Sequence, residues 1–150
     1  MRSGAILLAV ACLLGAPACT SSAEHEGEPT AEAERARAEG PKAVIEAYYQ
    51  ALSRRDYATA WQLWGKEPAA DDAAFRRFVD GFKDTELAIA EVGQPGAPAP
   101  VADYVHVRVP VHIEDLRSDG TGSGYDGTYT VRRTVDDPAS WHIYEGNLRR

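Results

Sequence analysis

The chain has 150 residues, which is enough for one domain and hardly for two. It carries 23 Asp and Glu residues against 16 Lys and Arg residues, and this formal net charge of −7, without any basic run, argues against a protein that binds nucleic acid. Both cysteines, Cys12 and Cys19, lie near the N-terminus, so we expect the rest of the chain to fold without disulfides.

The N-terminus has the three parts of a bacterial secretion signal. Arg2 supplies a positive charge, residues 5–15 form an apolar run, and Ala16-Pro17-Ala18 places small residues at positions −3 and −1 of a cleavage site. The apolar run is about a dozen residues long, whereas a helix that crosses a membrane needs about twenty. We therefore predict that residues 1–18 are a cleaved signal peptide.

Cys19 follows this site directly, and the segment resembles the lipobox of bacterial lipoproteins, except that Ala16 stands where that pattern usually has Leu. The resemblance implies a diacylglycerol thioether on Cys19, and Thr20 at position +2 implies sorting to the periplasmic face of the outer membrane. The alternative is cleavage by ordinary signal peptidase, which would leave a free N-terminal cysteine. Residues 19–39 hold no large apolar side chain, so we predict a lipid-anchored polar linker, helical in part from Thr30 onward.

The folded domain is expected from residue 40, and it opens with helices. Apolar side chains recur at helical spacing through Lys42–Arg54, which predicts an amphipathic helix there. Asp56 can cap a second helix over residues 57–65, and Asp71 or Asp72 can cap a third.

The hydrophobic period then changes from 3.6 to 2, which predicts strands. The clearest strand has Val or Ile at its odd-numbered positions and mostly polar side chains at its even-numbered ones. Pro110 removes one amide donor from it, so we expect an edge or a bulge at that point. Consecutive strands joined by short turns pair as neighbours, which predicts an antiparallel meander. The predicted strands are residues 86–92, 104–114, 125–135 and 141–148, with an irregular Gly- and Pro-rich connection at 93–100.

Four segments resemble nuclear transport factor two-like domains, also called cystatin-like or SnoaL-like. They are residues 43–52, 55–61, 127–133 and 141–143, and the match extends over about Pro41 to Leu148. The resemblance implies a cone-shaped α+β fold at 40–150, in which N-terminal helices pack on a curved antiparallel sheet of about four strands. That superfamily includes isomerases, dehydratases and polyketide cyclases as well as binding and assembly domains without chemistry, so fold does not supply function.

The cone implied by this resemblance would hold any pocket between the helices and the sheet. Acid–base chemistry there needs an ionisable group, yet the inward face of the strand at 104–114 consists of Val and Ile. If side chains alternate along the last strand, Glu145 faces inward like Trp141 and Ile143, and it is the one strand carboxylate expected to do so. Because it lies at a strand end, we assign no catalytic residue. Side chains that could line a pocket, unless they simply fill the core, are Tyr48, Tyr49, Trp61, Trp64 and Glu145.

No metal or cofactor is expected. His106 and His112 share the polar face of one strand, but six residues of strand separate them by about 20 Å, so they cannot bind one ion together. His112 and Glu114 are neighbours on that face, which is too little for a zinc site.

We therefore expect a membrane-tethered lipoprotein of the cell envelope whose domain binds or assembles without catalysis, with a ligand that the sequence does not identify. The alternative is an isomerase- or dehydratase-type enzyme with an ionisable group inside the cone. A third hypothesis places a homodimer contact or an envelope protein partner on the polar sheet face around His106 and Arg108.

Overall fold

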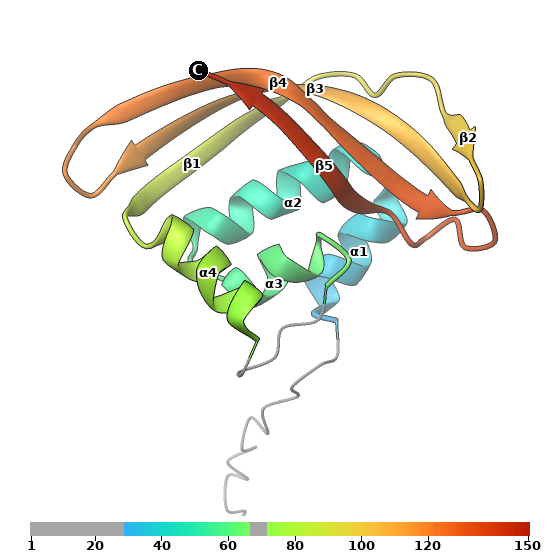
Figure 1. The fold of residues 1–150 in the computed structure, drawn as a ribbon, viewed down its shortest axis with the longest axis horizontal. Coiled ribbons are helices and arrows are strands. Elements are labelled where there is room, and N and C mark those ends of the chain that lie inside the picture. Colours follow the sequence, from blue (N-terminus) through green and yellow to red (C-terminus); the bar gives the residue numbers. More distant parts are fainter. Residues whose placement is uncertain (1–28, 67–71) are drawn as a thin grey trace, which may run out of the picture.

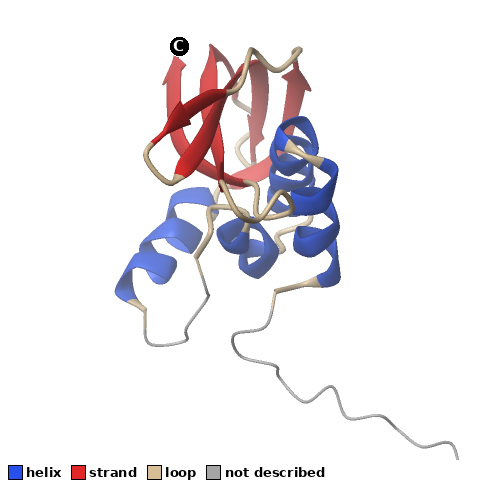
Figure 2. Ribbon diagram, turned by 90° about the vertical axis from the view of Figure 1, so that its right-hand side faces the viewer, coloured by secondary structure: helices blue, strands red, loops and turns tan. Residues whose placement is uncertain are grey.

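The structure, a computed structural model, describes residues 29–66 and 72–150, so the predicted signal peptide and Cys19 lie outside the described residues. Helices form one layer against the concave face of a curved antiparallel sheet (Figure 1), and the view turned by 90° separates the two layers (Figure 2). The predicted α+β fold is therefore confirmed. No helix in the described ranges is long and apolar enough to cross a membrane.

The helices begin where the sequence supplies caps. The side chains of Thr30, Asp56 and Asp72 each accept a hydrogen bond from a backbone amide in the first turn of a helix. Pro41 opens another helix at the position where its missing N–H costs nothing. The four helices are α1 (Ala31–Glu39), α2 (Pro41–Ser53), α3 (Tyr57–Gln62) and α4 (Ala73–Phe82).

The sheet has one strand more than predicted. Its strands are β1 (Thr85–Val92), β2 (Ala99–Val101), β3 (Tyr104–Arg117), β4 (Gly122–Thr134) and β5 (His142–Arg149). They are antiparallel in the order β1-β3-β4-β5, and the short β2 pairs with the N-terminal end of β3. The extra strand lies at the end of the Gly- and Pro-rich connection that we predicted to be irregular.

Pro110 lies in β3 at the point where one neighbouring strand gives way to the next. The pairing with β1 ends at Val111, and the pairing with β2 begins at His106. Between them, the amides of Gly93 and Gly96 donate to the carbonyls of Pro110 and Arg108 at 2.9 and 2.8 Å. The missing N–H of the proline therefore falls in an interruption of the ladder, which agrees with the expected irregularity at that point.

Alternation in β3 decides which face becomes the core. Val107 is buried, as predicted, and it lies opposite Val131 of β4 in the register. Burying an aliphatic side chain of this size stabilises a fold by about 1.5–3 kcal/mol. The inward side chains of β3 are Val107, Val109, Val111 and Ile113, and they meet Val44, Ile45 and Leu52 of α2 in one cluster.

Helix α1 corrects the predicted domain boundary, because residues 31–39 belong to the fold and not to a solvated linker. Ala33 is 0 % exposed and Ala36 is 4 % exposed. The backbone amide of Thr30 donates to the Gln62 Oε1 atom at 2.8 Å, and the Thr30 hydroxyl bonds the Thr59 hydroxyl at 2.9 Å. Alanine allows close packing between helices without adding the large apolar side chains that reveal a buried helix in a sequence.

We expect Ala33→Gln to lower the free energy of unfolding by about 1–3 kcal/mol, since the larger amide would have to enter a filled core. Ala38, on the exposed face of the same helix, provides the matched control, and Ala38→Gln should change stability by less than about 0.5 kcal/mol. Urea unfolding followed by circular dichroism measures both. Equal small effects would mean that α1 does not pack on the domain.

Candidate functional site

Four aromatic rings occupy the centre of the space between α2 and the sheet, and we call them the aromatic cluster: Tyr48, Tyr49, Trp64 and Tyr129. The rings pack edge to face, with centroid separations from 5.0 Å for Tyr48 and Tyr49 to 6.5 Å for Tyr48 and Tyr129. The hydroxyls of Tyr49 and Tyr129 form a buried hydrogen bond of 2.7 Å that joins helix to sheet. Three of the predicted pocket residues therefore lie together, and Tyr129 is the member that the sequence analysis missed.

The hydroxyls of the aromatic cluster are suited to hydrogen bonding and not to proton abstraction. Burial raises the pKa of Tyr48, Tyr49 and Tyr129 well above the ordinary tyrosine value, because the phenolate form would lose its hydration. A general base needs a pKa near the working pH. At neutral pH these three groups stay protonated and neutral.

Gly146 of β5 makes room for the cluster. It lies opposite Tyr129 in the register, and a Cβ atom at this position would come within 2.7 Å of the Tyr129 ring. No real side chain tolerates that approach without a shift of the ring. The close approach of β5 to Tyr129 therefore requires glycine here.

Trp61 and Glu145, the other two predicted pocket residues, lie apart from the cluster. Trp61 is buried, as expected, but it packs on Phe75 and Phe78 of α4, at 5.7 and 5.0 Å between ring centroids. The ammonium group of Lys66 lies 4.3 Å from the centroid of the same indole. Trp61 thus attaches α4 to α3.

Glu145 was predicted to face inward, and this prediction is wrong. The register of β4 and β5 shifts between Thr130 and Val131: Val131 pairs with Ile143, whereas Thr130 pairs with Glu145. Tyr144 is the extra residue of this β-bulge, which reverses the alternation that follows it. Glu145 therefore lies on the outer face of the sheet, exposed to solvent.

The bulge builds a groove of about 440 Å³ on the outer face of the sheet. One wall is the connection that contains β2, with the small apolar side chains of Ala97, Ala99 and Val101. The remaining lining comes from His106 and Arg108 of β3, Thr130 of β4, and Tyr144 and Glu145 of β5. We call this hollow the outer groove. It includes the surface around His106 and Arg108 that the sequence singled out as a partner site.

Tyr144, which borders the outer groove, is held in place by Arg132. The Arg132 guanidinium lies between the rings of Tyr104 and Tyr144, 4.2 and 4.0 Å from their centroids. The imidazole of His106 adds a further contact to Tyr144, with 5.3 Å between the ring centroids. Tyr144, on one side of the groove, is therefore supported by two neighbouring side chains.

His142 orients the same arginine. The Nδ1 atom of His142 donates to the Ser140 carbonyl at 2.9 Å, and its Nε2 atom then accepts from Arg132 Nε at 3.1 Å. Burial lowers the pKa of His142, and the positive charges of Arg132 and Arg37 lower it further. A neutral imidazole at neutral pH is what this pair of hydrogen bonds requires.

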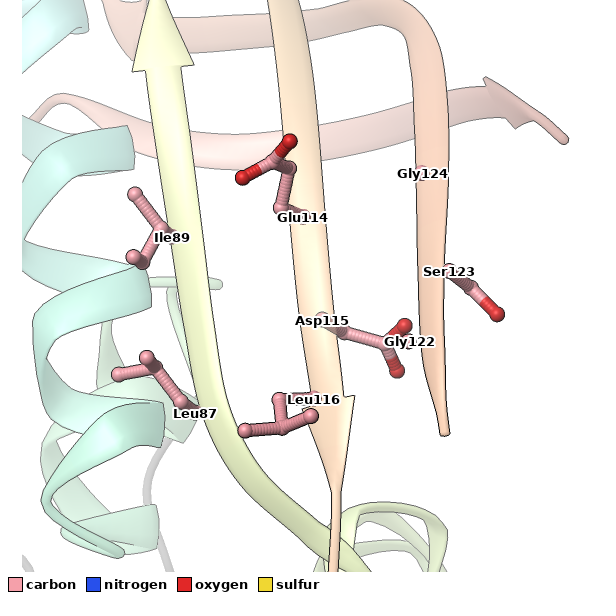
Figure 3. Close-up of a pocket in the computed structure, with 8 residues that line it drawn as sticks. All are labelled: Leu87, Ile89, Glu114, Asp115, Leu116, Gly122, Ser123 and Gly124. Atoms are coloured by element: carbon pink, nitrogen blue, oxygen red, sulfur yellow. The ribbon is translucent and has the colours of Figure 1, made fainter. Parts of the chain in front are cut away.

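A second hollow of about 400 Å³ lies at the opposite end of the outer face (Figure 3). Leu87, Ile89 and Leu116 form its apolar part, and all three are exposed. Gly122 and Gly124 of β4 lie opposite Leu116 and Glu114, so that no side chain of β4 covers this stretch of β3. The polar groups that line this hollow are Glu114, Asp115 and Ser123, so its apolar part is bordered by two carboxylates.

The described residues give no sign of a metal site. No group of three or more His, Cys, Asp or Glu side chains in residues 29–66 and 72–150 could hold an ion. The two strand histidines have separate partners, because His112 bonds Asp126 at 2.8 Å whereas His106 contacts Tyr144.

Comparison with solved structures supports the fold. An "aromatic ring hydroxylase", provisionally so named, from Novosphingobium aromaticivorans is similar over 78 % of this chain and 87 % of its own, with a TM-score of 0.53 and 18 % identity. A SEC-C motif-containing protein from Rhodopseudomonas palustris is similar over 75 % and 81 %, with a TM-score of 0.50 and 13 % identity.

A protein from Streptomyces avermitilis, provisionally named a dehydratase of the nuclear transport factor two-like family, is similar over 70 % and 90 %, with a TM-score of 0.46 and 18 % identity. No family model and no curated protein matches the sequence. At these identities the likeness concerns the fold alone, and the function has to be argued from the site.

We expect Gly146→Ala to lower the free energy of unfolding by about 1–3 kcal/mol, because the added methyl group would displace Tyr129 and disturb its hydrogen bond to Tyr49. Gly81 of α4 is the control: a Cβ atom there meets nothing within 4 Å, so Gly81→Ala should be neutral or stabilising by up to about 1 kcal/mol. Thermal and urea unfolding distinguish the two. A neutral Gly146→Ala would show that the cluster is loosely packed.

Stability should decline as the pH falls below about 6.5, the ordinary pKa of histidine, in a way that depends on His142. The pKa of folded His142 is lowered, so below this pH the unfolded chain takes up a proton that the folded chain resists. His112 acts in the opposite sense, because its hydrogen bond to Asp126 raises its pKa.

The measurement is the melting temperature of the wild type and of His142→Gln, each at pH 7.5 and 5.5. His112 and the carboxylates are present in both proteins, so their contribution to the pH dependence cancels in the comparison. On acidification, the melting temperature of the wild type should fall further than that of the variant. In the variant, a glutamine oxygen can still accept the hydrogen bond from Arg132. Identical losses would contradict the lowered pKa.

Proposed function

We propose that this protein is an exported, lipid-anchored domain of the cell envelope that binds a ligand on the outer face of its sheet and does so without catalysis. The observation that carries the proposal is the division between the two faces of the sheet. The centre of the concave side is packed with the aromatic cluster, whereas the outer side has a groove with an arginine, a glutamate and a histidine around it. Specific binding sites combine a preformed hollow with a few convergent polar groups in this way.

The composition of the interior weighs against the alternative, an isomerase- or dehydratase-type enzyme. The fully buried polar side chains in the described part of the chain are Thr59 and Gln62, and neither can act as a general base. Strand pairing does place one carboxylate, Asp115, at an inward position, opposite Ala88. It lies six residues along β3 from Val109, the partner of Tyr129, which is about 20 Å. Asp115 is therefore remote from Tyr129 along the sheet, and within the described residues no hydrogen bond links its buried carboxylate oxygen to the aromatic cluster.

The lipid anchor stays a prediction from the sequence, with the lipobox-like segment before Cys19 as its support. Mass spectrometry of the mature protein should find a diacylglycerol group on Cys19. Cys19→Ala should move the protein from the membrane fraction to the soluble periplasmic fraction, because acyl chains supply the membrane affinity. An unmodified Cys19 in a soluble wild-type protein would contradict the anchor.

A further inference from the structure

Two opposite charges face the outer groove without forming an ion pair. Arg108 pairs with Thr130 in the register, and Thr130 pairs with Glu145, so the three residues form one row across β3, β4 and β5. Both charged side chains line the groove, yet within the described part of the chain neither makes a salt bridge or a side-chain hydrogen bond. Elsewhere this chain does pair such groups, as Arg54 and Glu32 do at 2.6 Å.

The spacing of the row suits a ligand with a charge at each end. Two strand separations place the Cα atoms of Arg108 and Glu145 about 10 Å apart. The arginine and glutamate side chains extend several ångströms beyond these Cα atoms and can turn toward each other or apart, so together they can hold the two charged ends of a short zwitterion. The termini of an extended dipeptide or tripeptide are about 7–10 Å apart, at about 3.5 Å per residue.

The other residues that line the groove determine which ligand side chains fit between the two charged ends. Ala97, Ala99 and Val101 offer a small apolar wall, which leaves room for short aliphatic side chains. Tyr144 forms the opposite side and is braced from behind by the Arg132 guanidinium. A site whose walls are fixed before binding loses little conformational entropy when the ligand enters.

We propose that the outer groove binds a short zwitterionic peptide of two or three small residues, with its carboxylate on Arg108 and its ammonium group on Glu145. Arginine presents parallel N–H donors that match a carboxylate, and a glutamate accepts the hydrogen bonds of an ammonium group. This inference rests on the proposed function, since it names the ligand class of the same groove.

The test is isothermal titration calorimetry of the mature, detergent-solubilised protein with L-alanyl-L-alanine. Two matched probes remove one charge each: N-acetyl-L-alanyl-L-alanine lacks the ammonium group, and L-alanyl-L-alanine amide lacks the carboxylate. We expect the free dipeptide to bind at least about tenfold more tightly than either, the loss expected for one charged hydrogen-bond partner.

Variants of the two charged residues show which residue binds the carboxylate of the ligand and which binds its ammonium group. Arg108→Gln should lower the affinity for the free dipeptide about tenfold or more and leave the affinity for the amide probe unchanged. Glu145→Gln should also lower the affinity for the free dipeptide, but it should leave the affinity for the N-acetyl probe unchanged. Arg117→Gln, at the far end of β3, is the matched control and should have no effect. Circular dichroism verifies that each variant is folded.

Blocked and free dipeptides that bind equally, or wild-type affinity in both groove variants, would overturn the inference. Its failure is distinguishable from failure of the proposed anchor. A protein without diacylglycerol that still binds the dipeptide contradicts only the anchor, and an acylated protein that binds no probe contradicts only the ligand.

Discussion

The hydrogen bond between the hydroxyls of Tyr49 and Tyr129 fixes how the helical layer lies on the sheet. It joins α2 to β4 through polar atoms within a cluster of aromatic rings, and each phenol satisfies the other at 2.7 Å. A buried hydroxyl without such a partner would cost about 1–3 kcal/mol. Edge-to-face contacts with Tyr48 and Trp64 surround the pair, and Gly146 keeps β5 close enough to close the cluster.

Filling the interior in this way changes what the fold can do. A curved sheet over helices can enclose a chamber, but here aromatic rings occupy the centre of that space and their hydroxyls bond one another. In the function that we propose, recognition would fall to the solvent-facing side of the same strands. Arg108 alternates with the core residues Val107 and Val109, whereas the bulge brings both Tyr144 and Glu145 to the outer face. Packing inside the cone and the bulge together determine the spacing of these three residues.

Much of the architecture could be predicted because the sequence signals it locally. The alternation of Val and Ile in β3 identified its buried face, and the caps at Asp56 and Asp72 located two helix starts. Helix was predicted in part from Thr30 onward, but the packing of α1 on the domain was missed because its contacts are made by alanines, which do not distinguish a buried helix from a solvated one. Strand β2 was missed because a three-residue strand beside prolines has no periodicity to detect.

The site was harder to predict than the fold, for a reason that lies in one residue. Without the bulge at Tyr144, simple alternation would place Glu145 inside the cone, which is where the sequence pattern predicted it. A bulge is decided by how β5 pairs with β4, which single-strand patterns do not contain. The stacking of Arg132 between Tyr104 and Tyr144 depends on the same bulge, so it could not be anticipated either.

The early start of α1 has a consequence for how the domain would lie in the envelope. With α1 folded onto the domain, only residues 20–29 separate its first turn from Cys19, a contour of at most about 35 Å. Figure 1 shows that α1 begins on the helical side of the molecule, opposite the outer face of the sheet, and Thr30 is bonded there to α3. A lipid on Cys19 would hold the helical layer toward the bilayer, and the outer groove would then open away from the membrane into the aqueous compartment.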